Sequence, residues 1–321
     1  MSIDRRRFLS TAGSAAAALT AAQYSRVLGA NERVGVAVIG VNGRGNSHIS
    51  AYAKNPGAEV RAVVDIDQAV NEKAATRVAK EQGGNRPQEY SDMRKMFESK
   101  DIDAVSIATP NYWHALATIW ACQAGKDVYV EKPASHNIFE GRKMVEAARK
   151  YKRIVQCGQQ SRSTPHKIEA IQKLKDGVIG DVYMAKALCF KRRKSIGANQ
   201  PAPVPPGVDY DMWLGPAWPR AWKENRFHYN WHWYWDFGNG DIGNQGVHEM
   251  DVARWGLGLD ELPDNAFSEG GKFVYDDDQE TPNTQIAVFR YPEKQLMFEV
   301  RGLITGGEGN LLQDSGNGRH T

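Results

Sequence analysis

The stretch VGVAVIGVNGRG, residues 34–45, decides the fold of this 321-residue chain. It opens with an apolar run rich in valine, the pattern of a buried β-strand, and continues into a glycine-rich turn. Gly40 lets the chain turn tightly after the strand, and Gly45 lets the following helix pack closely against it. The amino end of such a helix faces a phosphate group, so the stretch predicts a dinucleotide-binding turn.

An acidic residue, Asp65, ends the next strand-like run, EVRAVVDID. A carboxylate at this position accepts hydrogen bonds from a ribose 2′-hydroxyl and repels a 2′-phosphate, which favours NAD over NADP. The usual glycine pattern is broken at one position, because Asn42 stands at the middle glycine and Gly43 follows it. Arg44 then adds a cation near the phosphates.

The chain after this turn alternates between two kinds of pattern. Strand-like runs are EVRAVVD, DAVSIAT, DVYVE and RIVQCG, and helical patterns separate them. This alternation is typical of a doubly wound parallel sheet of the Rossmann type. We therefore predict an α/β dinucleotide-binding domain over residues 31–158.

Longer strand-like runs characterise the second half of the chain, residues 159–321. They read DVYMAKALCF, TQIAVFRY and QLMFEV, and they predict an α+β domain with a mostly antiparallel open sheet. The closing stretch, TGGEGNLLQDSGNGRHT, has no packing pattern and suggests a sheet cut off before its last strands. The open sheet is expected to pair copies of the chain into a homo-oligomer.

Residues 1–30 carry a different signal. Paired arginines, Arg5 and Arg6, precede Phe8 and Leu9, and an alanine-rich stretch too short to span a bilayer follows. This resembles a twin-arginine export signal, so we expect passage through the twin-arginine translocase to the periplasm or cell envelope. The alternative is an amphipathic or disordered N-terminus with arginines paired by chance.

Composition excludes other classes of function. The net charge is only +3, and the basic run KRRK, residues 191–194, is interpreted as a solvated face rather than a nucleic-acid site. Three isolated cysteines argue against a disulfide framework or a CxxC metal site. His228, His232, Asp236 and Asp241 are of the residue types that bind metal ions, but their segment has no helical pattern, and we predict no metal site.

Three further strings fall where ligands of a parallel sheet bind. The string VYVEKP, residues 128–133, sits at the carboxyl end of a predicted strand, TPNYWH covers residues 109–114, and NQGVHEMD covers residues 244–251. Oxidation of an alcohol needs a base with a pKa near the operating pH, and His248 suits this role. Lys132, if buried beside a nicotinamide, could donate to or polarise the same oxygen. The structural alternatives are a lysine that only pairs with Glu131 and a histidine that caps a helix.

Together these strings closely resemble the glucose-fructose oxidoreductase, inositol dehydrogenase and MocA (Gfo/Idh/MocA) family, over roughly residues 34–302. The resemblance places Lys132 by the nicotinamide and the substrate. The family motif D-x-G-x-H supplies a substrate-binding aspartate and an acid/base histidine, and here it reads Asn244 to His248. Asn244 can orient a hydroxyl but cannot take its proton. The expected cofactor-binding residues are Gly40, Asn42, Gly43, Arg44, Gly45, Asp65, Thr109, Pro110, Asn111, His114, Glu131 and Lys132.

We therefore predict an exported NAD-dependent oxidoreductase that transfers hydride between NAD and a sugar, polyol or glycoside. The cofactor is expected to be tightly bound, because the cell envelope holds little free NAD. One alternative is a glycoside hydrolase or lyase that uses hydride transfer only transiently, and another is a non-catalytic sugar-binding or regulatory protein. The aromatic residues Tyr229, Trp231, Trp233, Tyr234 and Trp235 are equally compatible with walls for a sugar ring and with packing of a sheet core.

Overall fold

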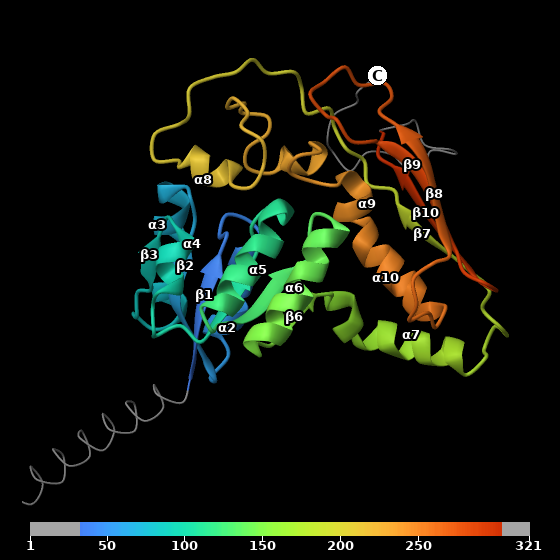
Figure 1. Ribbon diagram of the computed structural model, residues 1–321, viewed down its shortest axis with the longest axis horizontal. Helices are drawn as coiled ribbons and strands as arrows, with labels where there is room; N and C mark the ends of the chain where they lie inside the picture. Colours follow the sequence, from blue (N-terminus) through green and yellow to red (C-terminus); the bar gives the residue numbers. More distant parts are fainter. Residues whose placement is uncertain (1–32, 304–321) are drawn as a thin grey trace, which may run out of the picture.

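The computed structural model describes residues 33–303. Arg5 and Arg6 of the expected export signal, and the final stretch 304–321, lie outside the described residues. Across the described range, no helix has both the length and the apolar character needed to cross a membrane. Two sheets, each packed against helices, follow one another along the chain (Figure 1).

The first sheet contains six parallel strands in the order β3-β2-β1-β4-β5-β6. The strands are β1 (Val34–Ile39), β2 (Ala58–Val64), β3 (Gln88–Tyr90), β4 (Ala104–Ile107), β5 (Asp127–Glu131) and β6 (Val155–Gly158). The strand order reverses at β1, whose two neighbours are β2 and β4, and the carboxyl ends at such a point form a ligand crevice. The predicted Rossmann-type sheet is confirmed.

Helices cover both faces of this sheet. They are α2 (Gly45–Ala53), α3 (Gln68–Glu81), α4 (Met93–Phe97), α5 (His114–Gln123) and α6 (Ile138–Tyr151), with the 3-10 helix η1 (Asn111–Trp113) before α5. Buried valines Val36 and Val38 face α2 and α3, whereas Ile39 and Ile107 belong to the core shared with α4 and α5. Alternation along the strands therefore supplies both faces of the sheet with apolar side chains.

The second sheet has four strands in the order β7-β10-β9-β8. The elements are η2 (Gln160–Ser163), α7 (Pro165–Lys175), β7 (Met184–Cys189), α10 (Gly246–Gly256), β8 (Asn265–Gly271), β9 (Thr284–Arg290) and β10 (Gln295–Arg301). The sheet is mixed, because β7 runs parallel to β10 while the other pairs are antiparallel. Our sequence reading missed β8, since its residues NAFSEGG are exposed almost throughout and show no apolar alternation.

One face of the second sheet packs on α10, where Ala187 and Phe298 meet Met250 and Ala253. The other face is open and carries exposed apolar side chains, including those of Met184, Leu188, Phe267 and Ile286.

The long segment between β7 and α10 returns to the first sheet. It contains α8 (Tyr210–Leu214), η3 (Asn230–Trp233) and α9 (Gly240–Asn244). We call residues 205–214 the strap. The strap is hydrogen-bonded to the chain that directly follows β2: Gln68 N donates to Gly207 O at 2.9 Å, and Asp209 N donates to Ile66 O at 2.9 Å. The strap and α8 lie over the upper end of this sheet in Figure 1.

Trp213 of the strap packs into the core of the first sheet. Its side chain is 4% exposed, and its carbonyl accepts hydrogen bonds from Tyr112 and from Trp113 of η1. Its ring lies 4.8 Å from the ring of Phe237 and 5.9 Å from that of Tyr112, centroid to centroid. Trp213 therefore belongs to the core of the first sheet although it lies far along the chain.

We predict that Trp213→Ala lowers the free energy of unfolding by about 3–5 kcal/mol, because it removes a buried ring and leaves a cavity. Trp218→Ala is the matched control, since Trp218 is 78% exposed and its loss should change stability by less than about 0.5 kcal/mol. Urea unfolding followed by circular dichroism measures both variants. Equal effects of the two substitutions would contradict the anchoring role of Trp213.

Candidate active site

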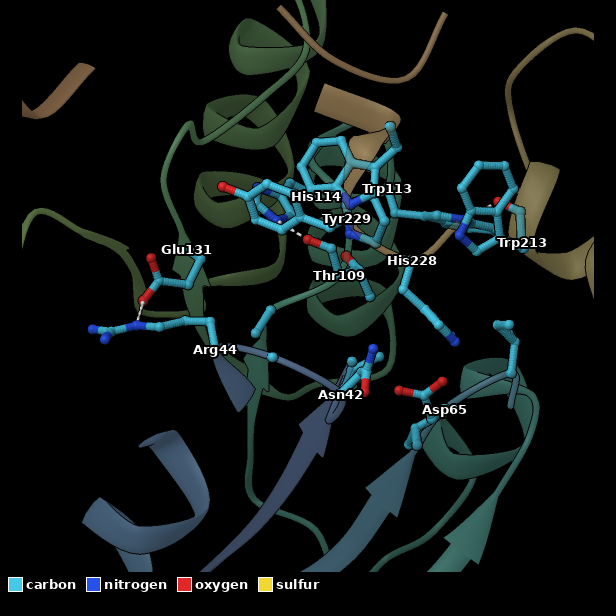
Figure 2. Close-up of a pocket in the computed structure, with 18 of the residues that line it drawn as sticks. Asn42, Arg44, Asp65, Thr109, Trp113, His114, Glu131, Trp213, His228 and Tyr229 are labelled. Atoms are coloured by element: carbon cyan, nitrogen blue, oxygen red, sulfur yellow. Dashed lines mark hydrogen bonds and ion pairs between the residues drawn. The ribbon is translucent and has the colours of Figure 1, made fainter. Parts of the chain in front are cut away.

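A cavity of about 580 Å³ lies at the carboxyl ends of the central strands of the first sheet. Its floor includes the glycine turn after β1 and Asp65 after β2, and its walls include Thr109 after β4 and Glu131 at the end of β5. Residues of the long segment, among them His228 and Tyr229, close it from above (Figure 2). The strand ends and the second half of the chain thus enclose one site.

The glycine turn is built for a ligand that approaches the backbone. Gly40 has φ +81°, and a Cβ there would lie 2.7 Å from Thr109 N. A Cβ on Gly45 would lie 2.1 Å from Gly40 O, so α2 can begin this close to the turn only with glycine. At Gly43 a Cβ would meet no atom within 4 Å, which leaves that backbone open to the cavity. These contacts suit a pyrophosphate at the amino end of α2.

Asp65 is fixed by the backbone around it. Its Oδ2 accepts from Val41 N at 2.9 Å and its Oδ1 accepts from Asp67 N at 3.1 Å. Burial raises the pKa of Asp65 to about 6, although these backbone hydrogen bonds lower it. Asp65 and Asn42 both line the cavity floor, where Figure 2 labels them. A ribose diol fits here, because its hydroxyls would supply further donors to the carboxylate.

Two more observations fit a dinucleotide in this cavity. Thr109 Oγ1 is buried and has no hydrogen-bond partner in the described part of the chain. At the adenosine end, His228 Nε2 lies 3.1 Å from Asp67 Oδ2, so that the long segment contacts the residue that caps α3. The hydroxyl of Thr109 is therefore free to bind a ligand, and the contact between His228 and Asp67 closes the cavity beside Asp65.

Glu131 is the centre of a buried polar network. Its Oε1 accepts from Arg44 Nε at 3.0 Å and from Gln160 Nε2 at 2.7 Å, and His48 Nε2 lies 3.0 Å away. His48 in turn contacts Ser106 Oγ at 2.8 Å through Nδ1. Burial alone would raise the pKa of Glu131, but hydrogen bonds from His48 and Arg44 lower it to about 2. Glu131 is therefore an ionised carboxylate that connects β5 to the glycine turn.

Lys132 reaches from the first sheet to the second half of the chain. Its Nζ donates to Asn244 O at 2.8 Å and to Asn244 Oδ1 at 3.1 Å. Burial lowers the pKa of Lys132, and the neighbouring carboxylate of Glu131 opposes this shift. Neutral oxygens thus hold the ammonium, which leaves its charge available to a ligand.

His248 lies on the first turns of α10 and lines the same cavity. Burial lowers its pKa, and the charge of Lys132 lowers it further. His232 also lines the cavity, and burial lowers its pKa to about 3, while its Nδ1 lies 2.6 Å from Tyr229 O. Both imidazoles are therefore neutral at pH 7, as a proton acceptor must be.

The structure brings most of the predicted site residues to one place. The predicted residues that line the cavity are Gly40, Asn42, Gly43, Arg44, Asp65, Thr109, Pro110, His114, Glu131, Lys132, Asn244 and His248. Gly45 and Asn111 do not line it. Gly45 packs against the turn, and Asn111 is buried and donates to Asn239 Oδ1 at 2.7 Å. His114 has both ring nitrogens against carbonyl oxygens, of Pro133 at 2.6 Å and Thr109 at 2.8 Å.

Our sequence reading missed Gln160 and His48. Gln160 follows β6, so the rule that ligands bind at the ends of parallel strands could have identified it. His48 gave no such signal, because only the folded chain brings α2 to β5.

The aromatic residues between positions 229 and 235 include some that line the cavity and some that pack in a core. Tyr229 and Trp231 line the cavity, whereas Trp233 and Tyr234 are buried in packing. Three of the four candidate metal ligands have other partners. His228 contacts Asp67, Asp236 forms an ion pair with Arg220, and Asp241 forms an ion pair with Arg193. Across residues 33–303 no group of three or more His, Cys, Asp or Glu side chains is placed to hold a metal ion.

Comparison with known families agrees with this site. A model described as "Oxidoreductase family, NAD-binding Rossmann fold" matches residues 34–159, and one described as "Oxidoreductase family, C-terminal alpha/beta domain" matches residues 182–277. Both are models of the Gfo/Idh/MocA family, and together they cover more than half of the chain. The chain belongs to the Gfo/Idh/MocA family, and its first domain has the NAD-binding fold of that family.

Two curated relatives are glycosyl hydrolase family 109 proteins. The one from Shewanella sp. (strain W3-18-1) is 28% identical over 211 residues, and the one from Shewanella sp. (strain ANA-3) is 27% identical over 209 residues. Each match covers 58% of this chain and 45% of the relative, so the chain matches less than half the length of these proteins.

Solved structures share the fold. The WlbA dehydrogenase from Chromobactrium violaceum, in complex with NADH and UDP-GlcNAcA, has a TM-score of 0.66 at 21% identity, covering 85% of this chain and 68% of that one. A putative myo-inositol dehydrogenase from Sinorhizobium meliloti 1021 has a TM-score of 0.58 at 22% identity, covering 85% and 70%. A levoglucosan dehydrogenase in complex with NADH has a TM-score of 0.65 at 20% identity, covering 84% and 67%.

We predict that NAD affinity depends on pH through Asp65. Ribose hydroxyls donate to the ionised carboxylate, and the ionised fraction grows as pH rises through the pKa of about 6. Between pH 5 and pH 7 the dissociation constant of NAD should therefore fall about tenfold. Calorimetric titration of nucleotide-free protein measures this slope. Asp65→Asn is the control and should bind NAD with no such dependence; an unchanged slope would show that another group is responsible.

Proposed function

We propose that the protein transfers hydride between NAD and a hydroxyl-bearing carbon of a sugar, polyol or glycoside. The observation that carries this proposal is that Lys132 and His248 line the same cavity as the glycine turn and Asp65. NAD, when bound, accepts or returns the hydride at its nicotinamide. The family to which the chain belongs and its likeness to NADH-bound dehydrogenases support the proposal.

In this proposal, His248 and Lys132 have different roles in proton transfer. His248 takes the proton from the reacting hydroxyl, because burial and Lys132 keep its imidazole neutral. Lys132 donates a hydrogen bond to the same oxygen from an ammonium that Asn244 orients through two oxygens. A carboxylate at position 244 would neutralise this ammonium, whereas the amide of Asn244 leaves its charge to act on the substrate.

A second candidate function is supported by the amide of Asn244 and by the relatives named glycosyl hydrolase family 109 proteins. Here a glycoside is oxidised only transiently, which permits loss of its substituent, and the hydride then returns from the cofactor to the sugar. The same residues serve both reactions. Net formation of NADH from a glycoside separates them, because the first reaction leaves the cofactor reduced, whereas the second returns the hydride to the sugar after its substituent has left.

We further propose that NAD is retained and crosses the membrane within the folded protein. The strap is bonded to the end of β2, and His228 contacts Asp67, so the adenosine end of the cavity is closed by the second half of the chain. Arg5 and Arg6 suit the twin-arginine route, which carries folded proteins. An enzyme outside the cytoplasmic membrane would need this order of events, because little free NAD is found there.

The open face of the second sheet supports a further proposal, that two copies of the chain pair through it. Exposed Met184, Leu188 and Ile286 lie there beside an ion cluster in which Lys186 and Arg301 contact Glu299. A face that carries apolar groups and both signs of charge can match itself across a two-fold axis. Light scattering on the purified protein tests this pairing.

We predict that Lys132→Met and His248→Ala each lower turnover by roughly a hundredfold or more while leaving NAD binding nearly unchanged. His166→Ala is the matched control, because His166 is exposed on α7 away from the cavity lining. The assay incubates NAD-loaded protein with sugars, polyols and glycosides, and follows both nicotinamide absorbance and product masses. Full activity of His248→Ala on a substrate that the native protein turns over would exclude the acid/base role.

We predict that protein purified from the cell envelope contains bound nucleotide. Retention through purification needs a dissociation constant well below micromolar, which corresponds to about −8 kcal/mol or better. The variant with lysine at Arg5 and Arg6 should stay in the cytoplasm and still contain cofactor. Nucleotide released by denaturation is measured in both fractions. Active envelope protein that is empty and depends on added NAD would contradict co-export.

A further inference from the structure

Within residues 33–303, four histidines line the cavity, and they differ in what their ring nitrogens contact. They are His114, His228, His232 and His248. Both nitrogens of His114 lie against carbonyl oxygens, and Nε2 of His228 lies against Asp67 at the adenosine end. His248 is the base of the proposed reaction. His232 lines the same cavity, and the proposed reaction gives it no role.

The proton of His232 has a fixed place on the ring. Its Nδ1 lies 2.6 Å from Tyr229 O. A carbonyl oxygen can only accept a hydrogen bond, so Nδ1 carries the proton and donates to it, and Nε2 keeps a lone pair. In the described part of the chain no hydrogen bond reaches Nε2. His232 therefore has one unused acceptor.

Aromatic neighbours hold the imidazole of His232 in place. The ring of Trp231 stacks on it, with 3.6 Å between centroids and 19° between planes. The ring of Tyr229 lies 4.7 Å away at an angle of 45°. All three side chains line the cavity. The orientation of Nε2 is thus set before a ligand arrives, which lowers the entropic cost of binding to it.

The backbone places His232 at the end of the cavity that contains Lys132. His232 belongs to η3, which packs against α9. Gly238 leads into α9 and passes so close to η3 that a Cβ on it would lie 2.5 Å from His232 O. Asn244 ends α9 and accepts from the ammonium of Lys132. The contacts of α9 therefore join His232 to the group that meets the substrate.

The imidazole of His232 suits binding rather than proton transfer. Burial lowers the pKa of His232 to about 3, so this ring cannot hold a proton taken from a hydroxyl near neutral pH. A neutral imidazole still accepts a hydrogen bond from a hydroxyl group. The roles of His232 and His248 are therefore different.

We propose that His232 determines substrate specificity, because its Nε2 accepts a hydrogen bond from a sugar hydroxyl other than the one that reacts. This inference rests on the proposed function and specifies which sugars fit the cavity. Lys132 and His248 act on the reacting oxygen, so the donor is a second hydroxyl of the same sugar. A sugar that lacks this second hydroxyl leaves Nε2 desolvated and unpaired, and it binds more weakly.

The first test uses the native, NAD-loaded protein. Calorimetry measures the binding of glucose and galactose and of their 2-, 3-, 4- and 6-deoxy analogues. One analogue that lacks a non-reacting hydroxyl should bind about tenfold more weakly than its parent sugar. Equal binding of every analogue and its parent would overturn the inference without any variant.

The second test compares His232→Phe with His232→Gln. Phenylalanine keeps a ring against Trp231 but has no acceptor, whereas the amide oxygen of glutamine can accept. In His232→Phe the parent sugar should bind about tenfold more weakly, and its advantage over that one analogue should disappear, while the other analogues keep their ratios. KM should rise with little change in kcat. His232→Gln should keep most of the native preference.

His166→Phe is the matched control, because it makes the same change at an exposed position outside the cavity lining, and it should match the native protein. An unchanged preference in His232→Phe, with hydride transfer intact, would overturn the inference and leave the proposed function standing. An equal loss for the parent and every analogue would also overturn it, because the substitution would then act through packing alone. Sugars that bind through His232 without any hydride transfer would contradict the proposed function instead.

Discussion

The buried carboxylate of Glu131 is the constraint on which the site depends. An unpaired charge at this depth would cost several kcal/mol, so the carboxylate requires donors from the elements around it. Arg44 supplies one from the glycine turn, His48 one from α2, and Gln160 one from the chain that leaves β6. Because Lys132 follows Glu131 directly, the glycine turn and Lys132 share one anchor.

The two halves of the chain contribute different groups to the cavity. The first sheet supplies the groups suited to NAD, but on its own it presents Lys132 without a partner. The second half provides Asn244, which accepts from that ammonium, and His248, which lines the same cavity. The long segment between the sheets closes the cavity because Trp213 packs into the core of the first sheet. Binding and chemistry are thus properties of the joined halves.

Charge is distributed unevenly along the cavity. The end at β2 is acidic, with Asp65 and Asp67 near the strap residue Asp209, and this suits a ribose diol while disfavouring an additional phosphate. At the opposite end, the ammonium of Lys132 lines the cavity and is held by the neutral oxygens of Asn244. A dinucleotide without a 2′-phosphate on its adenosine end would match this gradient.

The sequence by itself determined the first sheet, the glycine turn, Asp65 and the position of Lys132, because these depend on local patterns and on the rule that parallel strands end at one edge. It could not determine β8, whose exposed residues lack alternation, or the turning of Asn111 away from the cavity. Only the tertiary structure decided the strap and the network around Glu131. These features depend on contacts between residues far apart in the chain. The contacts of the strap form when the aromatic segment, which has no periodic pattern, packs against the first sheet, so no local sequence pattern could have indicated them.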